Sequence, residues 1–199
     1  MERKENLEII KKGLIIVDMI NGFVKEGVLA DSNISGIIPE IESLALEYLE
    51  KGDKVIAFKD CHYENSPELN TFPPHCMSGS EEVELVDELK RHEDKFIVFE
   101  KNSTSGLFVP EFFYYIQGMK NLTELVITGC CTDICILNLA IPLKNFFNQV
   151  NRNVEIIVPE NAVDTYNIPE VHEKDEWNDM AFRFMKQTGV QVVKKLERK

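Results

Sequence analysis

Short apolar segments recur along the chain, separated by segments of mixed polarity. Six of them are apolar and β-branched, and most of these are continuously apolar rather than alternating, namely residues 14–17, 55–58, 96–99, 125–128, 154–158 and 190–193. A continuous apolar run of this length is typical of a strand that is covered on both faces. The pattern therefore predicts about six buried strands.

The segments between these strands carry helical periodicity. In residues 37–48, apolar side chains recur at intervals of three and four, which places them on one face of a helix that we expect to end at Gly52. Further helices are predicted over residues 83–89, 112–119, 134–147 and 170–187. Pro142 falls inside the third of these, where we expect a kink or a turn. Strands that alternate with helices predict an α/β fold, with three α-β-α layers around a mostly parallel, roughly six-stranded sheet.

Length and composition bound the class of protein. The chain has 199 residues and no Pro-, Gly- or Ser-rich linker or internal repeat, so we expect a single domain over residues 1–199. Lys and Arg total 22 against 34 Asp and Glu, which gives a net charge of −12. This acidic balance argues against binding to nucleic acid or to an anionic membrane, because both need clustered positive charge. The charge says little about a small neutral substrate, which is the partner that we expect, and a homo-oligomer stays open.

Two features favour a cytoplasmic protein. Basic residues at the N-terminus precede an apolar stretch that is too short for a secretory signal and ends at Asp18, and no segment approaches the roughly 18 apolar residues of a membrane span. The five cysteines are odd in number, unlike the disulfide framework of a small secreted protein. We therefore expect reduced thiols in a cytoplasmic compartment.

Polar residues directly follow four of the predicted strands. Asp18 follows the first, Asp60 and His62 follow the second, Lys101 follows the third, and residues 128–135 (Thr-Gly-Cys-Cys-Thr-Asp-Ile-Cys) follow the fourth. The carboxyl ends of parallel strands meet at one edge of a sheet, where ligand crevices lie. An aspartate, a lysine and a cysteine are therefore predicted to converge there.

Cys135 is the candidate nucleophile of this group. Thr132 or Asp133 can cap the following helix, which would place Cys135 in its first turn, where unpaired N–H groups favour a thiolate. The same N–H groups can stabilise an oxyanion. The alternative is that Cys135 packs as a small apolar side chain. For Cys130 and Cys131, which sit where the strand turns, we favour packing.

Asp18 comes directly after four apolar residues, so its carboxylate needs a partner in the interior. Lys101 is the obvious cation. One interpretation is a structural ion pair. The other is a general base that deprotonates Cys135 and is held in place by Lys101.

The irregular stretch over residues 61–80 suggests a metal site. His62 and His75 lie in it with Glu64 and Glu68, directly after Asp60. Carboxylate and imidazole together suit a divalent ion such as zinc, iron or manganese, with Glu64 and Glu68 competing as a further ligand. The alternative is that these are polar residues of a surface loop.

The two remaining histidines are interpreted as surface residues. His92 lies in the charged segment 90–93, at the end of a predicted helix, and His172 lies in the acidic segment 170–173.

Three motifs, in their order along the chain, resemble those of the isochorismatase-like cysteine hydrolases. Residues 14–23 (Leu-Ile-Ile-Val-Asp-Met-Ile-Asn-Gly-Phe) are similar to the family's first strand with its catalytic aspartate, here Asp18. Lys101 matches the lysine after strand three, and residues 129–135 match the segment that ends in the nucleophile, here Cys135. The resemblance covers nearly the whole chain and implies the family's own three-layer fold, the isochorismatase-like hydrolase fold.

The metal group resembles that of the nicotinamidases within this family. Asp60, His62 and His75 match their metal loop, and Glu68 stands seven residues before His75, as in members that use a glutamate, so we favour Glu68 over Glu64. The resemblance implies one divalent ion, with zinc the first choice and iron or manganese the alternatives.

The resemblance also implies how the rest of the site is formed. A cis peptide bond is expected between Cys130 and Cys131, with the N–H groups of Cys131 and Cys135 forming the oxyanion hole. Phe23 and Phe72 are expected to pack against the substrate ring. The family's usual aromatic close behind the lysine is missing, which leaves Phe108 as a substitute wall.

The activity that the resemblance implies is hydrolysis of nicotinamide to nicotinate and ammonia, a step of NAD salvage, through a thioester on Cys135. Three alternatives compete with it. The chain could be another hydrolase of the superfamily that acts on a different amide or a vinyl ether. It could be a non-catalytic protein that binds a small ligand. It could also be a metal or redox sensor, although its cysteines show no C-x-x-C spacing.

Overall fold

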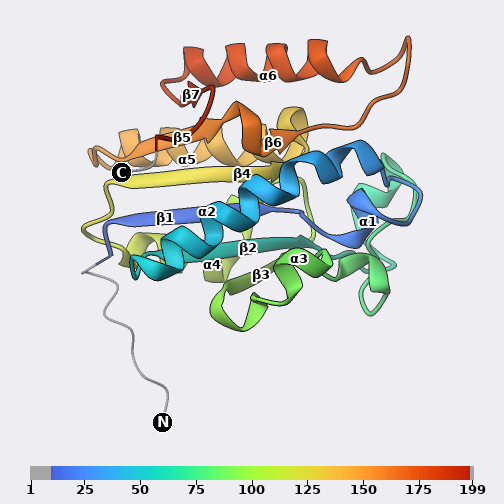
Figure 1. Ribbon diagram of the computed structural model, residues 1–199, viewed down its shortest axis with the longest axis horizontal. Helices are drawn as coiled ribbons and strands as arrows, with labels where there is room; N and C mark the ends of the chain where they lie inside the picture. Colours follow the sequence, from blue (N-terminus) through green and yellow to red (C-terminus); the bar gives the residue numbers. More distant parts are fainter. Residues whose placement is uncertain (1–9, 198–199) are drawn as a thin grey trace.

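The structure of the protein, a computed structural model, describes residues 10–197 (Figure 1). Residues 1–9 and 198–199, which the single-domain prediction and the argument on the N-terminus also cover, lie outside the described part. The strands are β1 (Lys12–Val17), β2 (Lys54–Asp60), β3 (Ile97–Lys101), β4 (Glu124–Cys130), β5 (Glu155–Pro159), β6 (Val163–Asp164) and β7 (Gln191–Val193).

These strands form one parallel sheet in the order β3-β2-β1-β4-β5-β7, with β6 paired to the end of β4. The six predicted strands and their parallel arrangement are confirmed. The short β6 was not predicted, because two residues carry no periodicity. Since β1 is central, the ends of β2, β1 and β4 lie next to one another.

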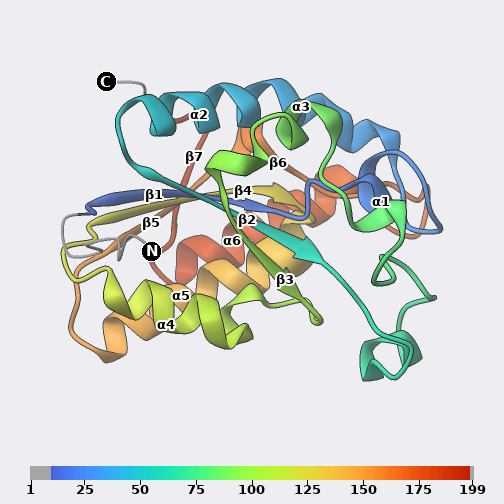
Figure 2. The ribbon, with the colours of Figure 1, turned by 90° about the horizontal axis from the view of Figure 1, so that it is seen from below.

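Helices cover both faces of the sheet (Figure 2). They are α1 (Asn21–Val24), α2 (Ile38–Glu50), α3 (Asp87–Lys90), α4 (Pro110–Gly118), α5 (Leu137–Gln149) and α6 (Lys174–Gln187). Alternate side chains of β1 point to opposite faces of the sheet. Leu14 and Ile16 pack in the core under α2, whereas Ile15 and Val17 pack in the core under α4 and α5. The continuous apolar run of β1 is thus explained by cover on both sides.

Two helix predictions differ from the structure. The helix predicted over residues 83–89 is wrong for most of its length, because the 3₁₀ turn ends at Val83 and the short α3 begins only at Asp87, and the last helix begins at Lys174 rather than at residue 170. Helix α5 continues through Pro142, so a turn there is wrong. The proline leaves the carbonyl of Asn138 without its helical donor, and Ser105 Oγ donates to that carbonyl at 2.7 Å instead. No helix within residues 10–197 is long and apolar enough to cross a membrane.

Candidate functional site

The carboxyl ends of β1, β2 and β3 bring three charged side chains together. Asp60 and Lys101 are the last residues of β2 and β3 and stand opposite each other in the strand register, and Asp18 directly follows β1. All three are buried, at 2% exposure or less. The sequence predicted this convergence from strand order alone, and the structure brings the side chains together.

Lys101 is the centre of this group. Its Nζ lies 2.9 Å from Oδ2 of Asp18, 2.8 Å from Oδ1 of Asp60 and 3.7 Å from Sγ of Cys135. We call these four residues the lysine network. A single ammonium therefore joins the carboxylate beside the thiol to a carboxylate of the predicted metal group, a link that was not foreseen.

Two backbone features hold Asp18 in place. Its φ is +54°, in the left-handed region, a conformation that costs a non-glycine residue roughly 1–3 kcal/mol and often occurs at functional sites. Its N–H donates to the carbonyl of Phe58 at 3.0 Å. On the other side, a Cβ on Gly129 would lie 2.0 Å from the carbonyl oxygen of Val17, so only glycine lets β4 approach β1 this closely.

Burial and the neighbouring charges set the protonation of the network. Burial raises the pKa of Asp18 to about 6, against the lowering effect of Lys101 and with a further rise from Asp60. Burial also raises the pKa of the Cys135 thiol well above its usual value, although Lys101 opposes the shift. Burial would lower the pKa of Lys101, but Asp18 and its other anionic neighbours raise it well above normal. The network therefore holds a fixed ammonium and a carboxylate that titrates close to neutrality.

Cys135 lies where β4 passes into α5. Residues Thr132–Ile136 form a π-helical turn that continues into α5, and Cys131 precedes it as the N-cap residue. We call residues 130–136 the cysteine turn. Cys135 is the fourth residue of this helical run, so its N–H belongs to the first turn, whose donors have no helical partner.

The predicted cap by Thr132 or Asp133 is wrong. Cys131 occupies the cap position and makes no side-chain cap bond. The carboxylate of Asp133 faces the other way, where it accepts a hydrogen bond from Thr165 Oγ1 at 2.5 Å and lies 3.0 Å from Nε2 of His172.

The two vicinal cysteines have different surroundings. The peptide bond between them is cis, which confirms that expectation. Cys130 is fully buried, and its thiol donates to the backbone carbonyl of Asp18 at 3.2 Å. Cys131 lines the cavity described below, together with Cys135.

Four residues form a compact group at one end of the site. One ligand atom from each of Asp60, His62, Glu68 and His75 lies within 4.8 Å of the corresponding atom of every other member. We call this group the carboxylate–histidine cluster. Its members lie on β2 and on the loop that follows it. Glu64 is exposed and lies outside the cluster.

The hydrogen bonds of the two histidines prepare them to bind a cation. Nδ1 of His62 lies 2.8 Å from Oδ1 of Asn102, and Nδ1 of His75 lies 2.8 Å from the carbonyl oxygen of Pro73. Both partners are acceptors, so each Nδ1 is the donor in its pair. Each Nε2 points into the cluster, 2.9 Å from Oδ2 of Asp60 for His62 and 3.2 Å for His75. A histidine that binds a cation through Nε2 keeps its proton on Nδ1 in the same way.

The charges in this region also fit a divalent ion. Three carboxylates, those of Asp18, Asp60 and Glu68, face a single ammonium, that of Lys101, and this leaves two negative charges in a mostly buried site. Histidines that bind the ion through Nε2 are neutral and add nothing to this balance. A divalent cation would neutralise the group, as buried charge requires.

The segment after Lys101 supports the cluster from outside. Asn102 contacts His62, as described above, and the N–H of Thr104 donates to Oε2 of Glu68 at 3.1 Å. Sequence reasoning did not single out either residue. Their only signal was their position directly after the end of β3, where side chains reach the same rim as the strand-end residues.

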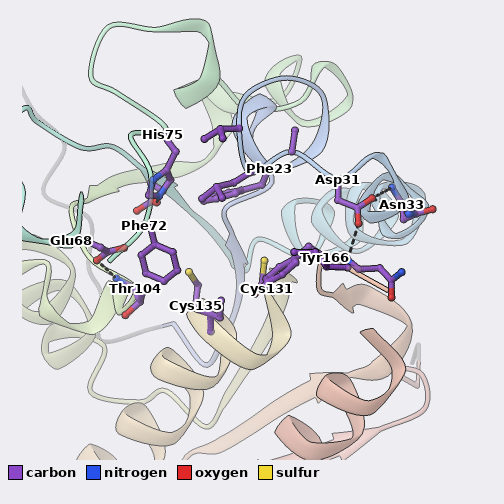
Figure 3. A pocket seen from close by; sticks show the side chains of 17 residues that line it. Phe23, Asp31, Asn33, Glu68, Phe72, His75, Thr104, Cys131, Cys135 and Tyr166 are labelled. Atoms are coloured by element: carbon purple, nitrogen blue, oxygen red, sulfur yellow. Dashed lines mark hydrogen bonds and ion pairs between the residues drawn. The ribbon is translucent and has the colours of Figure 1, made fainter. Parts of the chain in front are cut away.

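A cavity of about 370 Å³ opens onto both groups (Figure 3). In Figure 3 the thiols of Cys135 and Cys131 lie between Glu68 and His75 on one side and Tyr166 and Asp31 on the other. The volume of the cavity and its lining of apolar and polar side chains are typical of a small-molecule site. The wall formed by residues 28–33 and 166–168 was not predicted, because nothing in the local sequence shows that these loops meet.

The three phenylalanines predicted to line the cavity divide into two groups. Phe23 and Phe72 do line it, with ring centroids 5.8 and 6.1 Å from that of His75. Phe108 does not, and its prediction as a substrate wall is wrong. It ends a 3₁₀ turn (Gly106–Phe108) that directs it outward, where it is 74% exposed and borders a separate surface hollow.

The histidine predictions outside the cluster also divide. His92 contacts Glu42 at 3.1 Å and is not part of the cavity. His172 is not a surface residue as predicted: it is 5% exposed, stacked between Tyr166 and Trp177. The prediction was based on the acidic residues next to His172 in sequence, which do not show that the fold buries its ring.

Comparisons with known proteins agree on one family. Residues 12–195 match the family model of the isochorismatase domain. Nicotinamidase 1 of Arabidopsis thaliana is 31% identical, over 92% of this chain and 86% of the plant protein. The crystal structure of nicotinamidase PncA from Bacillus subtilis superposes with a TM-score of 0.76 at 30% identity, covering 92% of this chain and 99% of that one. The pyrazinamidase of Pyrococcus horikoshii, solved in complex with zinc, has the same fold, with a TM-score of 0.74 at 23% identity over 92% and 98% of the two chains.

Proposed function

The chain belongs to the isochorismatase family, and from this premise we propose that it hydrolyses nicotinamide to nicotinate and ammonia. The observation that carries the proposal is a single cavity lined both by Cys135 and by members of the carboxylate–histidine cluster, Asp60, Glu68 and His75. A thiol beside a cation site suits a substrate that carries a carboxamide and, a short distance away, a ring nitrogen with a free lone pair. Nicotinamide has both.

The carboxylate–histidine cluster is the proposed metal site. Asp60, His62, Glu68 and His75 would hold one divalent ion, for which zinc is our first choice given its nitrogen and oxygen donors, with iron or manganese as alternatives. The ion, when bound, supplies a coordination position for the pyridine nitrogen and so orients the ring. Phe23 and Phe72 flank His75 and pack against the ring.

The lysine network activates the nucleophile. The Cys135 thiol is protonated at rest because burial raises its pKa, so it needs a base. Asp18, ionised above about pH 6, accepts the thiol proton while Lys101 stabilises both anions. The sulfur then attacks the carboxamide carbon, and the carbonyl π electrons move onto the oxygen.

The cysteine turn stabilises the resulting oxyanion. The N–H groups of Cys131 and Cys135 are the proposed donors, at the start of the helical run that leads into α5. Collapse of the intermediate breaks the C–N bond, and the nitrogen takes the proton from Asp18 and leaves as ammonia. Water then adds to the thioester with Asp18 again as base. The C–S bond breaks, nicotinate leaves and the thiol is restored.

An ammonia-release assay tests the proposal. Nicotinamide is compared with benzamide, which has the same carboxamide but no ring nitrogen, each with and without a chelator. We expect rapid hydrolysis of nicotinamide, much slower hydrolysis of benzamide, and loss of the preference when the metal is removed. A chelator-insensitive enzyme, or one that prefers another amide, contradicts the assignment.

The nucleophile is tested separately. Cys135→Ala should abolish ammonia release and leave the metal content unchanged, because its side chain is not in the carboxylate–histidine cluster. Cys61→Ala removes another buried thiol, one that does not line the cavity, and serves as the matched control that keeps activity. Wild-type turnover by Cys135→Ala would disprove the thioester mechanism.

A further inference from the structure

One buried histidine plays no part in the chemistry proposed above. His172 lies in the segment between β6 and α6, and its ring is stacked between two aromatic side chains. The ring of Tyr166 is 3.9 Å away at an interplanar angle of 13°, and that of Trp177 is 4.6 Å away at 14°. A polar ring enclosed in this way needs partners for both of its nitrogens.

Both partners of the His172 ring are acceptors. Nδ1 lies 2.9 Å from the backbone carbonyl oxygen of Tyr166, and Nε2 lies 3.0 Å from Oδ2 of Asp133. The ring therefore contacts both segments directly, and at least one of its nitrogens donates a hydrogen bond.

The charged surroundings of His172 are few. The cysteine turn presents the carboxylate of Asp133, which also accepts from Thr165 Oγ1. The residue's own segment presents the titratable side chain of Tyr166, and α6 presents the uncharged ring of Trp177. Lys174, at the start of α6, is paired with Asp164 at 2.9 Å. Asp133 is thus the carboxylate in direct contact with His172.

These contacts join two parts of the site. Asp133 lies in the same π-helical turn as Cys135, two residues before it. On the other side, His172 exchanges backbone hydrogen bonds with Ile168, and both Tyr166 and Ile168 line the cavity. His172 therefore connects the turn that carries the thiol to the cavity wall formed by residues 166–168.

We propose that His172 is a positioning residue: held between Tyr166 and Trp177, it links Asp133 to the backbone of Tyr166 and so keeps the cysteine turn in register with the cavity wall. This inference rests on the proposed function for its activity readout. Its effect on the reaction comes from geometry, because a misplacement of a nucleophile by about 1 Å can cost on the order of a hundredfold in rate.

Three variants separate this role from simple packing. His172→Phe keeps a planar ring between the two aromatic residues but removes both ring nitrogens, and we expect kcat to fall about ten- to a hundredfold with a much smaller change in KM. His172→Arg supplies a planar, stacking group with several donors and should recover most of kcat. His92→Phe, the same substitution at the histidine that contacts Glu42, is the matched control and should keep wild-type activity.

A measurement on the wild-type protein tests the hydrogen bonds of the ring independently of activity. Proton–nitrogen-15 NMR of the labelled histidines should show a ring N–H of His172 that exchanges slowly with water, because it is buried and hydrogen-bonded, with the resonance assigned by its loss in His172→Phe or His172→Arg. A freely exchanging ring N–H overturns the proposal, and so does a His172→Phe enzyme with wild-type kcat. Should His172→Phe fail to fold, the NMR result and the kcat of His172→Arg decide. A wild-type protein inactive on nicotinamide refutes the proposed function instead, and leaves the NMR test standing.

Discussion

The two halves of the cavity are formed by different means. The lysine network comes from strand ends and the start of a helix, so the sheet itself fixes Asp18, Lys101 and Cys135. The carboxylate–histidine cluster takes only Asp60 from a strand, and its other members come from the loop that follows β2. A sheet positions side chains through its own register, whereas a loop needs added hydrogen bonds. We call the lysine network the nucleophilic half and the carboxylate–histidine cluster the metal half. The geometry of the nucleophilic half should therefore tolerate substitutions around it, whereas the metal half should depend on hydrogen bonds from residues outside the cluster.

Lys101 is where the two halves meet, so its removal should have the largest effect. Lys101→Met leaves Asp18 and Asp60 buried without their cation, and breaking a buried ion pair in this way costs about 3–5 kcal/mol. We expect the free energy of unfolding to fall by that amount in urea titration, and ammonia release to be lost.

The matched control for Lys101 is another buried lysine of the same sheet. Lys59 lies on β2 and pairs with Glu93, which is itself partly exposed, at 3.3 Å. Lys59→Met should cost only about 1 kcal/mol, as expected for a solvent-screened pair. Equal losses in the two variants would show that Lys101 does not join the two halves.

The same difference explains what could be predicted from the sequence. Asp18, Asp60 and Lys101 were found because a strand end has a known place in an α/β sheet. Glu68 and His75 lie in a loop without periodicity, and only the resemblance to a family distinguished Glu68 from Glu64. Interactions between segments distant in sequence left no local pattern.

Two errors have the same origin. Phe108 was assigned to the cavity from its distance along the chain behind Lys101, but the 3₁₀ turn that it ends rotates it to the surface. His172 was assigned to the surface from its acidic neighbours, but Tyr166 and Trp177 enclose it. In both cases the deciding structure, a tight turn for Phe108 and tertiary contacts for His172, leaves no pattern in a single sequence.

The dependence of the metal half on outer contacts predicts the next effect. Asn102→Ala removes the acceptor that fixes Nδ1 of His62, and loss of such a partner typically weakens metal binding about 10- to 100-fold. Titration with zinc and a competing chelator measures this directly. The kcat of the fully loaded enzyme should change far less, because the lysine network is untouched.

The exposed Asn145 on α5 supplies the control for this experiment. Asn145→Ala should bind metal as the wild type does. If Asn102→Ala also keeps wild-type affinity, the metal half is held as firmly as the nucleophilic half and the contrast between them fails.

The protonation of Asp18 should determine how kcat/KM depends on pH. Burial raises the pKa of Asp18 to about 6, and the base must be ionised to accept the thiol proton. As pH falls below about 6, Asp18 gains a proton, so kcat/KM should drop about tenfold per pH unit and should be restored on returning to pH 7. Metal content measured at each pH separates this from loss of the ion. A profile that stays flat down to pH 5 contradicts Asp18 as the base.

The smallest expected effect is a change in KM when an aromatic residue of the cavity wall is replaced. It tests whether a local turn decides which way a side chain points. Phe72 lines the cavity beside His75, so Phe72→Ala should raise KM for nicotinamide several-fold, since a buried aromatic contact contributes about 1–2 kcal/mol. Phe108→Ala makes the same change on the outer surface and should leave KM and kcat within about twofold. An increase in KM for Phe108→Ala alone would mean that the 3₁₀ turn over Gly106–Phe108 reorients when substrate binds. The side of the cavity next to Lys101 would then be the adaptable one.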